Sequence, residues 1–261
     1  IQIYAENNQE AYDNMVQAFR ISEHKDVRLP IMICQDGFIT SHAVENIELL
    51  EDDVVKNFVG EYEPENYLLN PKEKMAVGPY AITDYYMEAK RNQAEGMKNA
   101  VAVVKEVAKE FAGISGREYG LFEEYCMEDA ETAVVMIGSA AGTTKDAIDA
   151  LRAKGEKVGL IKIRLYRPFP ADELAAALKD VKAVAIMDRA EGYTNHGGPL
   201  GADVMSALFR ARSQALAVNY IYGLGGRDVR VEDMENVFAE LQTIIDNDDA
   251  GETYRYMGIR E

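Results

Sequence analysis

Four short apolar runs, each followed by a helical pattern, fill the second half of the chain. Val, Ile and Ala dominate these runs and turn residues bound them, as is typical of strands buried on both faces. The runs are residues 132–138, 158–166, 182–188 and 215–223. Because consecutive parallel strands need a crossover connection, this alternation predicts an α/β domain, with a four-stranded parallel sheet covered by helices on both faces.

The first 57 residues have the pattern of the end of another α/β sheet domain. Residues 1–5 read IQIYA, a strand-like run, and Asn7 or Asn8 can cap a helix after it. Residues 29–36, LPIMICQD, form a continuous apolar run of strand length. Such a run favours a strand buried in a parallel sheet.

Residues 58–125 are predicted to connect the two sheet domains. Segment 58–86 holds three of the seven prolines and five of the fifteen tyrosines, without clear periodicity. It carries too many aromatic residues for a free linker, so we expect an extended connection that lies on a surface. Apolar residues at helical spacing then predict a helix over 86–112, which Gly113 can end. The second domain is predicted to span 126–261.

The composition excludes several classes of function. The formal net charge of the 261 residues is −17, which would repel a nucleic-acid backbone. No apolar run approaches the roughly 20 residues that a membrane helix needs. Two cysteines, Cys34 and Cys126, provide neither a disulfide framework nor a paired metal motif. A reducing, cytoplasmic location is expected.

Ligands of parallel sheets bind at the carboxyl ends of the strands, so the loops there hold the candidate site residues. The loop 138–144 begins a helix and could hold a phosphate, but it lacks both common glycine fingerprints, and close strand–helix packing is the preferred interpretation. Arg164 and Arg167 lie at the end of a predicted strand and could bind a carboxylate or phosphate; pairing with an acidic residue across a subunit interface is favoured.

Two further loops carry candidate residues. Asp36 and His42, in DGFITSH, lie at the carboxyl end of the strand predicted in the first domain. Arg227 and Asp228 lie in the glycine turn YGLGGRD, where Asp228 is close enough to the next helix to assist its start.

The loop 188–199, DRAEGYTNHGGP, is the most unusual of these segments. Asp188 and Arg189 open it, and His196 could act as a general acid or base. No cysteine or serine partner for nucleophilic chemistry is evident. Its glycines permit close approach by a ligand or another chain. We therefore favour a structural or interface loop over a catalytic one.

Six segments, taken together and in this order, resemble the alpha subunit of the pyruvate:ferredoxin oxidoreductases (pyruvate synthases) in their multi-subunit archaeal form. They are DGFITSH at 36–42, GPYAITDYY at 78–86, YGLFEEYCMEDAE at 119–131, RLYRPFP at 164–170, DRAEGYTNHGGPLGADV at 188–204 and YGLGGRDV at 222–229. The resemblance implies that residues 1–57 end a thiamine-diphosphate pyrimidine-binding-type domain. It also implies that residues 126–261 form a transketolase C-terminal-like domain.

The resemblance further implies a complex that interconverts pyruvate and coenzyme A with acetyl-CoA and carbon dioxide. Thiamine diphosphate and Mg²⁺ would be shared with a partner subunit, and iron–sulfur clusters on the beta, gamma and delta partners would pass electrons to ferredoxin. Two cysteines cannot ligate a four-iron cluster, which agrees with clusters on other subunits. None of these groups is expected to be bound by this chain alone.

The chain departs from the family pattern because it lacks the N-terminal part of the pyrimidine-binding domain, where the family's catalytic residues lie. We therefore expect this chain alone to be inactive and its role to be mainly structural. Alternatives are a subunit of a 2-oxoglutarate or indolepyruvate oxidoreductase, or a non-catalytic scaffold fragment. A free-standing nucleotide-binding domain is disfavoured because the glycine fingerprint is missing.

Overall fold

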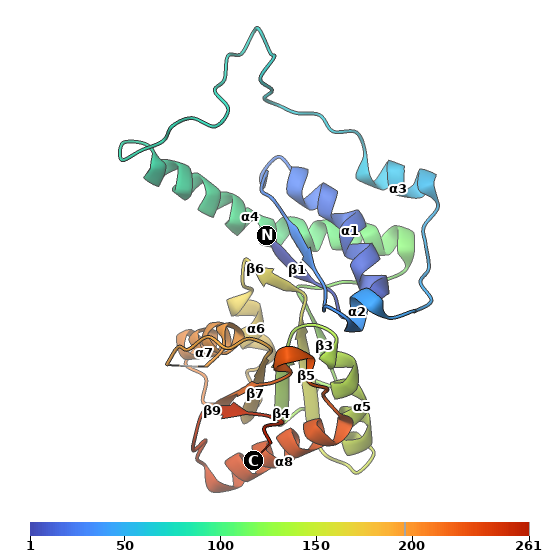
Figure 1. The fold of residues 1–261 in the computed structure, drawn as a ribbon, viewed down its shortest axis with the longest axis vertical. Helices are drawn as coiled ribbons and strands as arrows, with labels where there is room; N and C mark the ends of the chain where they lie inside the picture. Colours follow the sequence, from blue (N-terminus) through green and yellow to red (C-terminus); the bar gives the residue numbers. More distant parts are fainter. Residues whose placement is uncertain (196, 261) are drawn as a thin grey trace.

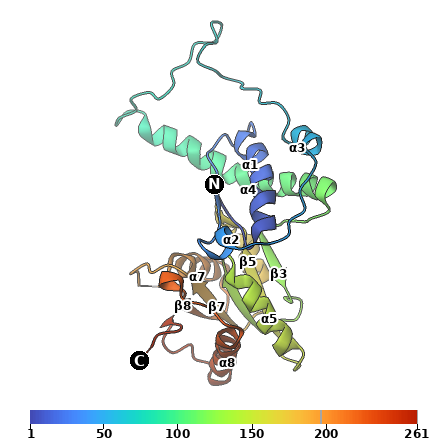
Figure 2. The ribbon, with the colours of Figure 1, turned by 45° about the vertical axis from the view of Figure 1, so that its right-hand side comes forward.

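Two separate β-sheets organise the chain in the computed structural model, which describes residues 1–195 and 197–260. The first sheet has the strand order β2-β1-β6, and the second has the order β3-β5-β4-β7-β8-β9. Figures 1 and 2 show the first sheet with its helices at one end of the molecule and the second sheet with its helices at the other.

The second sheet confirms the α/β prediction. Its four central strands are parallel and lie within the predicted runs: β4 (Thr132–Met136), β5 (Val158–Ile163), β7 (Ala183–Asp188) and β8 (Leu216–Ile221). Helices α5 (Ala140–Arg152) and α8 (Val231–Asn247) cover one face, and α6 (Ala171–Ala177) and α7 (Pro199–Ala211) cover the other. Both faces of β4 and β7 are buried, which explains their continuous apolar sequences.

The predicted count of four strands is wrong, because two edge strands extend the sheet to six. Strand β3 (Phe122–Tyr125) pairs antiparallel with β5, and β9 (Tyr254–Tyr256) pairs parallel with β8. Their sequences, FEEY and YRY, are short and mix polar with apolar residues. Edge strands carry no long apolar run, so the pattern that revealed the central strands is absent from them.

The run predicted as one strand over 158–166 divides between the two sheets. Strand β5 ends at Ile163, and β6 (Leu165–Arg167) pairs antiparallel with β1 (Gln2–Tyr4) of the first sheet. Strand β2 (Met32–Cys34) pairs parallel with the other edge of β1. Arg164 therefore lies where the chain crosses from one sheet to the other.

Two helices cover the first sheet. In α1 (Asn8–Glu23), Asn7 is the N-cap, and its side chain accepts a hydrogen bond from the Glu10 N–H at 2.9 Å. Helix α4 (Tyr86–Ser115) packs against α1 and passes through Gly113, the predicted end, because Gly116 supplies the left-handed C-cap at φ 72°. The core between them is apolar and includes Ile3, Val104 and Phe111.

Short helices α2 (Ile39–His42) and α3 (Asp52–Val59) lead into residues 60–85, which we call the arm. The arm has no helix or strand and arches away from both sheets before α4 begins (Figures 1 and 2). It is extended, as predicted, but most of it does not lie on the surface of this chain. The 3-10 turn η1 (Leu224–Gly226) completes the elements. No helix in the described part of the chain is long and apolar enough to span a membrane.

Candidate functional site at the junction of the sheets

Three of the predicted loops meet at Asp36, which follows strand β2. One of its carboxylate oxygens accepts a hydrogen bond from the backbone N–H of Ser139 at 2.6 Å. The other lies 3.3 Å from Nη1 of Arg189. Ser139 precedes helix α5, whose N-terminal N–H groups carry partial positive charge. Asp36 thus joins the first domain to the two loops that follow β4 and β7.

Arg189 is held between Asp36 and an aromatic ring. Its guanidinium carbon lies 5.6 Å from the centre of the Tyr222 ring. Its Nε is buried and has no hydrogen-bond partner among the described residues. A Cβ on Gly223 would lie 2.6 Å from that nitrogen, so only glycine allows the loop after β8 to pass this side chain.

Asp188 does not face this junction and instead anchors helix α7. Its carboxylate accepts hydrogen bonds from the N–H groups of Leu200 at 3.0 Å and Gly201 at 2.7 Å. It also accepts one from the amide of Asn219 at 2.9 Å. Burial raises the pKa of Asp188, and these three hydrogen bonds oppose the increase. All three hydrogen bonds come from groups of this chain, so Asp188 positions helix α7 and the loop that leads into it.

The glycines of the loop allow close approach, as predicted, but the approaching groups belong to this chain. A Cβ on Gly197 would lie 2.0 Å from the Asn219 Oδ1, and one on Gly198 would lie 2.2 Å from the Asp188 Cγ. The Gly198 N–H donates to the Asn219 Oδ1 at 2.8 Å. The close approach at these two glycines is therefore made by the Asn219 and Asp188 side chains of the same chain.

The outer part of the loop is fixed by Glu191. Its two carboxylate oxygens accept hydrogen bonds from the hydroxyls of Tyr254 and Tyr256 on strand β9. Tyr193 is 90% exposed and has a positive φ of 49°, which non-glycine residues rarely adopt. His196 lies outside the described residues. The loop is thus tied to its own chain while presenting one aromatic side chain outward.

Both candidate arginines after β5 are paired within this chain. Arg164 donates to Asn14 at 2.8 Å, to Gln17 at 3.1 Å and to the carbonyl of Gly120 at 3.2 Å. Its side chain is almost completely buried, and burial lowers its pKa to about 10. The favoured pairing with an acidic residue of another subunit is therefore wrong for Arg164, because its guanidinium is buried and donates to three neutral groups of this chain.

Arg167 and Tyr166 lie on the other side of this crossing. Arg167 pairs with Asp203 of α7 at 2.7 Å, and its guanidinium carbon lies 3.8 Å from the centre of the Tyr166 ring. Arg167 is partly exposed, in contrast to Arg164. Its acidic partner, like the neutral partners of Arg164, belongs to this chain.

The remaining candidates do not join the junction. His42 is exposed, stacks on Phe38 at 4.8 Å between ring centres, and its Nδ1 lies 2.7 Å from the Ser41 hydroxyl. Arg227 is exposed and donates to the carbonyl of Gly258. Asp228 is exposed as well.

The prediction that Asp228 assists the start of helix α8 is wrong. The carboxylate at that helix end belongs to Asp233, which accepts a hydrogen bond from the Arg230 N–H at 2.9 Å. Arg230 is the N-cap, so the acidic residue three positions after it is the one within reach.

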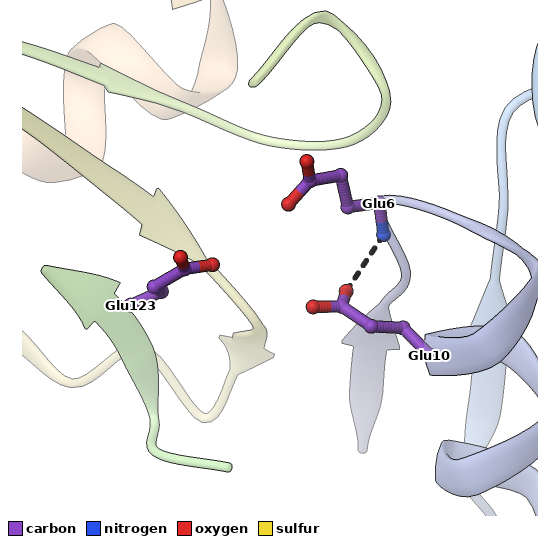
Figure 3. A group of neighbouring side chains, drawn as sticks. All are labelled: Glu6, Glu10 and Glu123. Atoms are coloured by element: carbon purple, nitrogen blue, oxygen red, sulfur yellow. Dashed lines mark hydrogen bonds between the residues drawn. The ribbon is translucent and has the colours of Figure 1, made fainter. Parts of the chain in front are cut away.

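A cluster of charged side chains between the two domains was not predicted from the sequence. Figure 3 shows the carboxylates of Glu6, Glu10 and Glu123 converging from the loop before α1, from α1 and from β3. The ammonium of Lys162 on β5 lies 2.7 Å from Glu6, 2.7 Å from Glu123 and within hydrogen-bond reach of Glu10. Lys145 of α5 adds contacts of 2.9 Å to both Glu6 and Glu123.

This cluster does not fit a metal ion, although three carboxylates lie close together. Lys162 and Lys145 already supply the positive charge that a Mg²⁺ ion would bring. Burial raises the pKa of Glu123, but the two ammonium groups lower it further, and the net direction is downward. The cluster therefore acts as an ionic contact between the domains and not as a metal site.

Comparison with known proteins agrees with this two-domain architecture. A solved 2-oxoglutarate:ferredoxin oxidoreductase from Magnetococcus marinus shares the fold, with a TM-score of 0.58 over 92% of this chain and 42% of that chain at 17% identity. The model of the thiamine-diphosphate-binding part of pyruvate flavodoxin/ferredoxin oxidoreductases matches residues 1–109. The model of pyruvate:ferredoxin oxidoreductase core domain II matches residues 130–234.

Proteins with similar sequences identify the family of this chain. Pyruvate synthase subunit PorA of Thermotoga maritima is 44% identical over the whole chain, and that of Methanocaldococcus jannaschii is 39% identical over 95% of it. The fold and these matches place the chain in the class of proteins that both family models describe, the pyruvate flavodoxin/ferredoxin oxidoreductases. The chain belongs to the pyruvate:ferredoxin oxidoreductase family.

The chain matches only part of the length of these relatives, and its relatives are not all archaeal or all pyruvate synthases. The chain spans 66% and 63% of the length of the Thermotoga and Methanocaldococcus proteins. The similarity also extends beyond the archaeal proteins, since Thermotoga maritima is a bacterium. The alpha subunit of an NADH-dependent phenylglyoxylate dehydrogenase from Aromatoleum evansii is 36% identical over 94% of the chain.

Proposed function

We propose that this chain forms part of the alpha subunit of a pyruvate synthase, which interconverts pyruvate and coenzyme A with acetyl-CoA and carbon dioxide. The observation that carries the proposal is the 44% identity to a pyruvate synthase alpha subunit across all 261 residues. Both family models match in the corresponding order along the chain. The activity belongs to the assembled complex in the cytoplasm.

The described residues support a positioning role for this chain. Asp36, Arg189 and the Ser139 N–H fix the loops at the carboxyl ends of the two sheets relative to one another. The ion pairs of Lys162 with Glu6 and Glu123 form a second set of contacts between the two domains. A subunit built in this way presents a rigid edge to its partners.

We infer that thiamine diphosphate and its Mg²⁺ are held jointly with a partner subunit. When bound, thiamine diphosphate supplies the carbanion that 2-oxoacid decarboxylation requires. The three-carboxylate cluster of this chain is neutralised by lysines and does not supply the metal site. Iron–sulfur clusters on beta, gamma and delta partners would carry the electrons to ferredoxin, and coenzyme A would be a substrate of the complex.

The experiment that tests this function uses the intact complex copurified with this chain. The assay measures coenzyme-A-dependent reduction of a low-potential dye, with pyruvate, 2-oxoglutarate and indolepyruvate as separate substrates. Selective reduction with pyruvate is the expected result. Reduction with either of the other two substrates alone would overturn the pyruvate assignment while keeping the family.

A second candidate function follows from the phenylglyoxylate dehydrogenase relative at 36% identity. Its substrate carries an aromatic ring where pyruvate carries a methyl group. Phenylglyoxylate therefore belongs in the same assay, with NAD⁺ as an alternative electron acceptor. Turnover of phenylglyoxylate in preference to pyruvate would replace the first proposal by this one.

A further inference from the structure

The arm, residues 60–85, exposes large apolar side chains that nothing in this chain covers. Leu69 is 85% exposed, Tyr80 is 90% exposed and Tyr85 is 71% exposed. Leu68 and Val77 are also mostly exposed. Exposed apolar side chains that gather on one segment, rather than lying singly on the surface, are typical of an interaction site. The exposed series continues onto the first turn of α4, where Met87 is 79% exposed.

The arm does not have the composition of a flexible linker. Linkers and disordered segments are poor in aromatic and aliphatic residues, whereas the arm is rich in both. Irregular connections longer than about 15 residues are uncommon in folded domains and are often functional. Backbone hydrogen bonds inside the arm are local turns, such as Asn70 N to Tyr67 O at 3.1 Å.

The base of the arm is fixed to the first domain, so the arm leaves it in a defined direction. Glu65 forms an ion pair with Arg28, and Phe58 of α3, just before the arm, is buried beside Phe111 of α4. At its far end the arm enters α4, whose later turns pack on α1. Figures 1 and 2 show the segment between these two anchors projecting from the end of the molecule opposite the second sheet.

We propose that the arm binds across an apolar groove of another subunit of the oxidoreductase, one whose groove has a basic rim. This inference rests on the proposed function for the existence of such a subunit. The arm carries five acidic side chains and two lysines, a net charge of −3. A second copy of this chain, with a net charge of −17, would repel it, whereas a basic rim would attract it.

Site-specific cross-linking in the intact complex tests the occupant directly. A benzoylphenylalanine replaces Tyr80 in the full subunit, coexpressed with its partners; the same group at Phe209 of α7, which is 85% exposed, is the matched control. The expected product joins position 80 to a different subunit. A product that joins two copies of this chain, a product within one chain, or no product from an intact complex would overturn the proposal.

A double variant with polar residues in the arm measures the contribution of the arm to assembly. Leu68→Ser with Leu69→Ser should weaken the affinity of the subunit for its partners by at least about 30-fold, as loss of central interface residues commonly does. Phe209→Ser is the control and should change the affinity less than threefold. Unchanged affinity in the arm variant, with an unchanged melting temperature of the subunit, would overturn the proposal.

The failure of this inference can be distinguished from failure of the proposed function. Cross-linking and affinity report assembly and use no 2-oxoacid. A complex that assembles through the arm but oxidises another 2-oxoacid would keep the inference and change only the substrate. A complex that oxidises pyruvate but assembles without the arm would keep the proposed function and overturn the inference about the arm.

Discussion

The junction between the two sheets holds charged side chains that are paired inside the chain, whereas the arm holds apolar side chains that are exposed. Lys162 is 3% exposed and contacts three carboxylates, but Tyr80 is 90% exposed. Each arrangement reverses the usual distribution, in which apolar groups are buried and charges are exposed. Buried charges must therefore be paired within the chain, while exposed apolar groups can be covered by a partner outside it.

Lys162→Met should produce the largest loss of stability, because it leaves Glu6 and Glu10 without their central counter-charge. Removing one partner of a buried ion pair typically costs about 3–5 kcal/mol of unfolding free energy. Chemical denaturation of the isolated chain measures the change. Lys98→Met is the control, since Lys98 is exposed and lies 4.0 Å from its nearest acidic partner. Equal stability of the two variants would show that the junction is not an ionic contact.

Gly198→Ala should also destabilise the second domain. The new Cβ would lie 2.2 Å from the Asp188 Cγ and would displace the carboxylate that anchors α7. Overpacking of this kind costs up to about 3 kcal/mol. Gly113→Ala, with nothing within 4 Å of the new Cβ and a helical position, should instead be neutral or slightly stabilising. A stable Gly198→Ala variant would contradict the role assigned to Asp188.

The central strands of the second sheet could be predicted from the sequence, whereas its edge strands could not. The central strands β4 and β7 are continuous apolar runs, so the sequence pattern alone predicted them. The edge strand β3 is FEEY, which resembles a loop as much as a strand. Arg164 marks the crossing between the sheets, but only the structure shows that β5 ends just before it. A sequence pattern reports local burial and does not report which sheet a strand joins.

The candidate site was foreseen in part for a similar reason. Asp36 and Arg189 were singled out because each follows a strand at its carboxyl end, and the structure brings them within 3.3 Å. The Lys162 cluster was missed because its members are far apart along the chain. Its one local signal was a lysine in the otherwise apolar run VGLIKI. A buried lysine requires acidic partners, but the sequence does not say which of 45 acidic residues supply them.

The ion pairs of Glu123 at the junction should make the stability of the chain depend on pH. The folded-state pKa of Glu123 lies below its usual value, so its ion pairs stabilise the fold above the unfolded-state pKa of about 4.3. That contribution is lost as the pH falls through the folded-state pKa. Melting temperatures measured from pH 6 to pH 3 should therefore fall less in Glu123→Gln than in the unaltered chain. A parallel fall in the two proteins would exclude a contribution from this carboxylate.

Asp36→Ala should have a smaller effect, because the Asp36–Arg189 pair is partly exposed. The loss of its hydrogen bond to Ser139 and of the ion pair should cost about 1 kcal/mol. Asp172→Ala is the control, since Asp172 is 86% exposed and lies 3.4 Å from Arg210, and it should cost nothing measurable. If both variants are equally stable, Asp36 does not join the two domains.

The smallest effect on the isolated chain is expected from the arm. Tyr80→Ser removes a side chain that is 90% exposed and should change the unfolding free energy by less than about 0.5 kcal/mol. Phe111→Ala removes a fully buried aromatic ring of the first domain and should cost about 4 kcal/mol. Denaturant titration of both variants measures this difference. A large loss from Tyr80→Ser would mean that the arm folds onto its own chain in solution, and the contrast between arm and junction would then disappear.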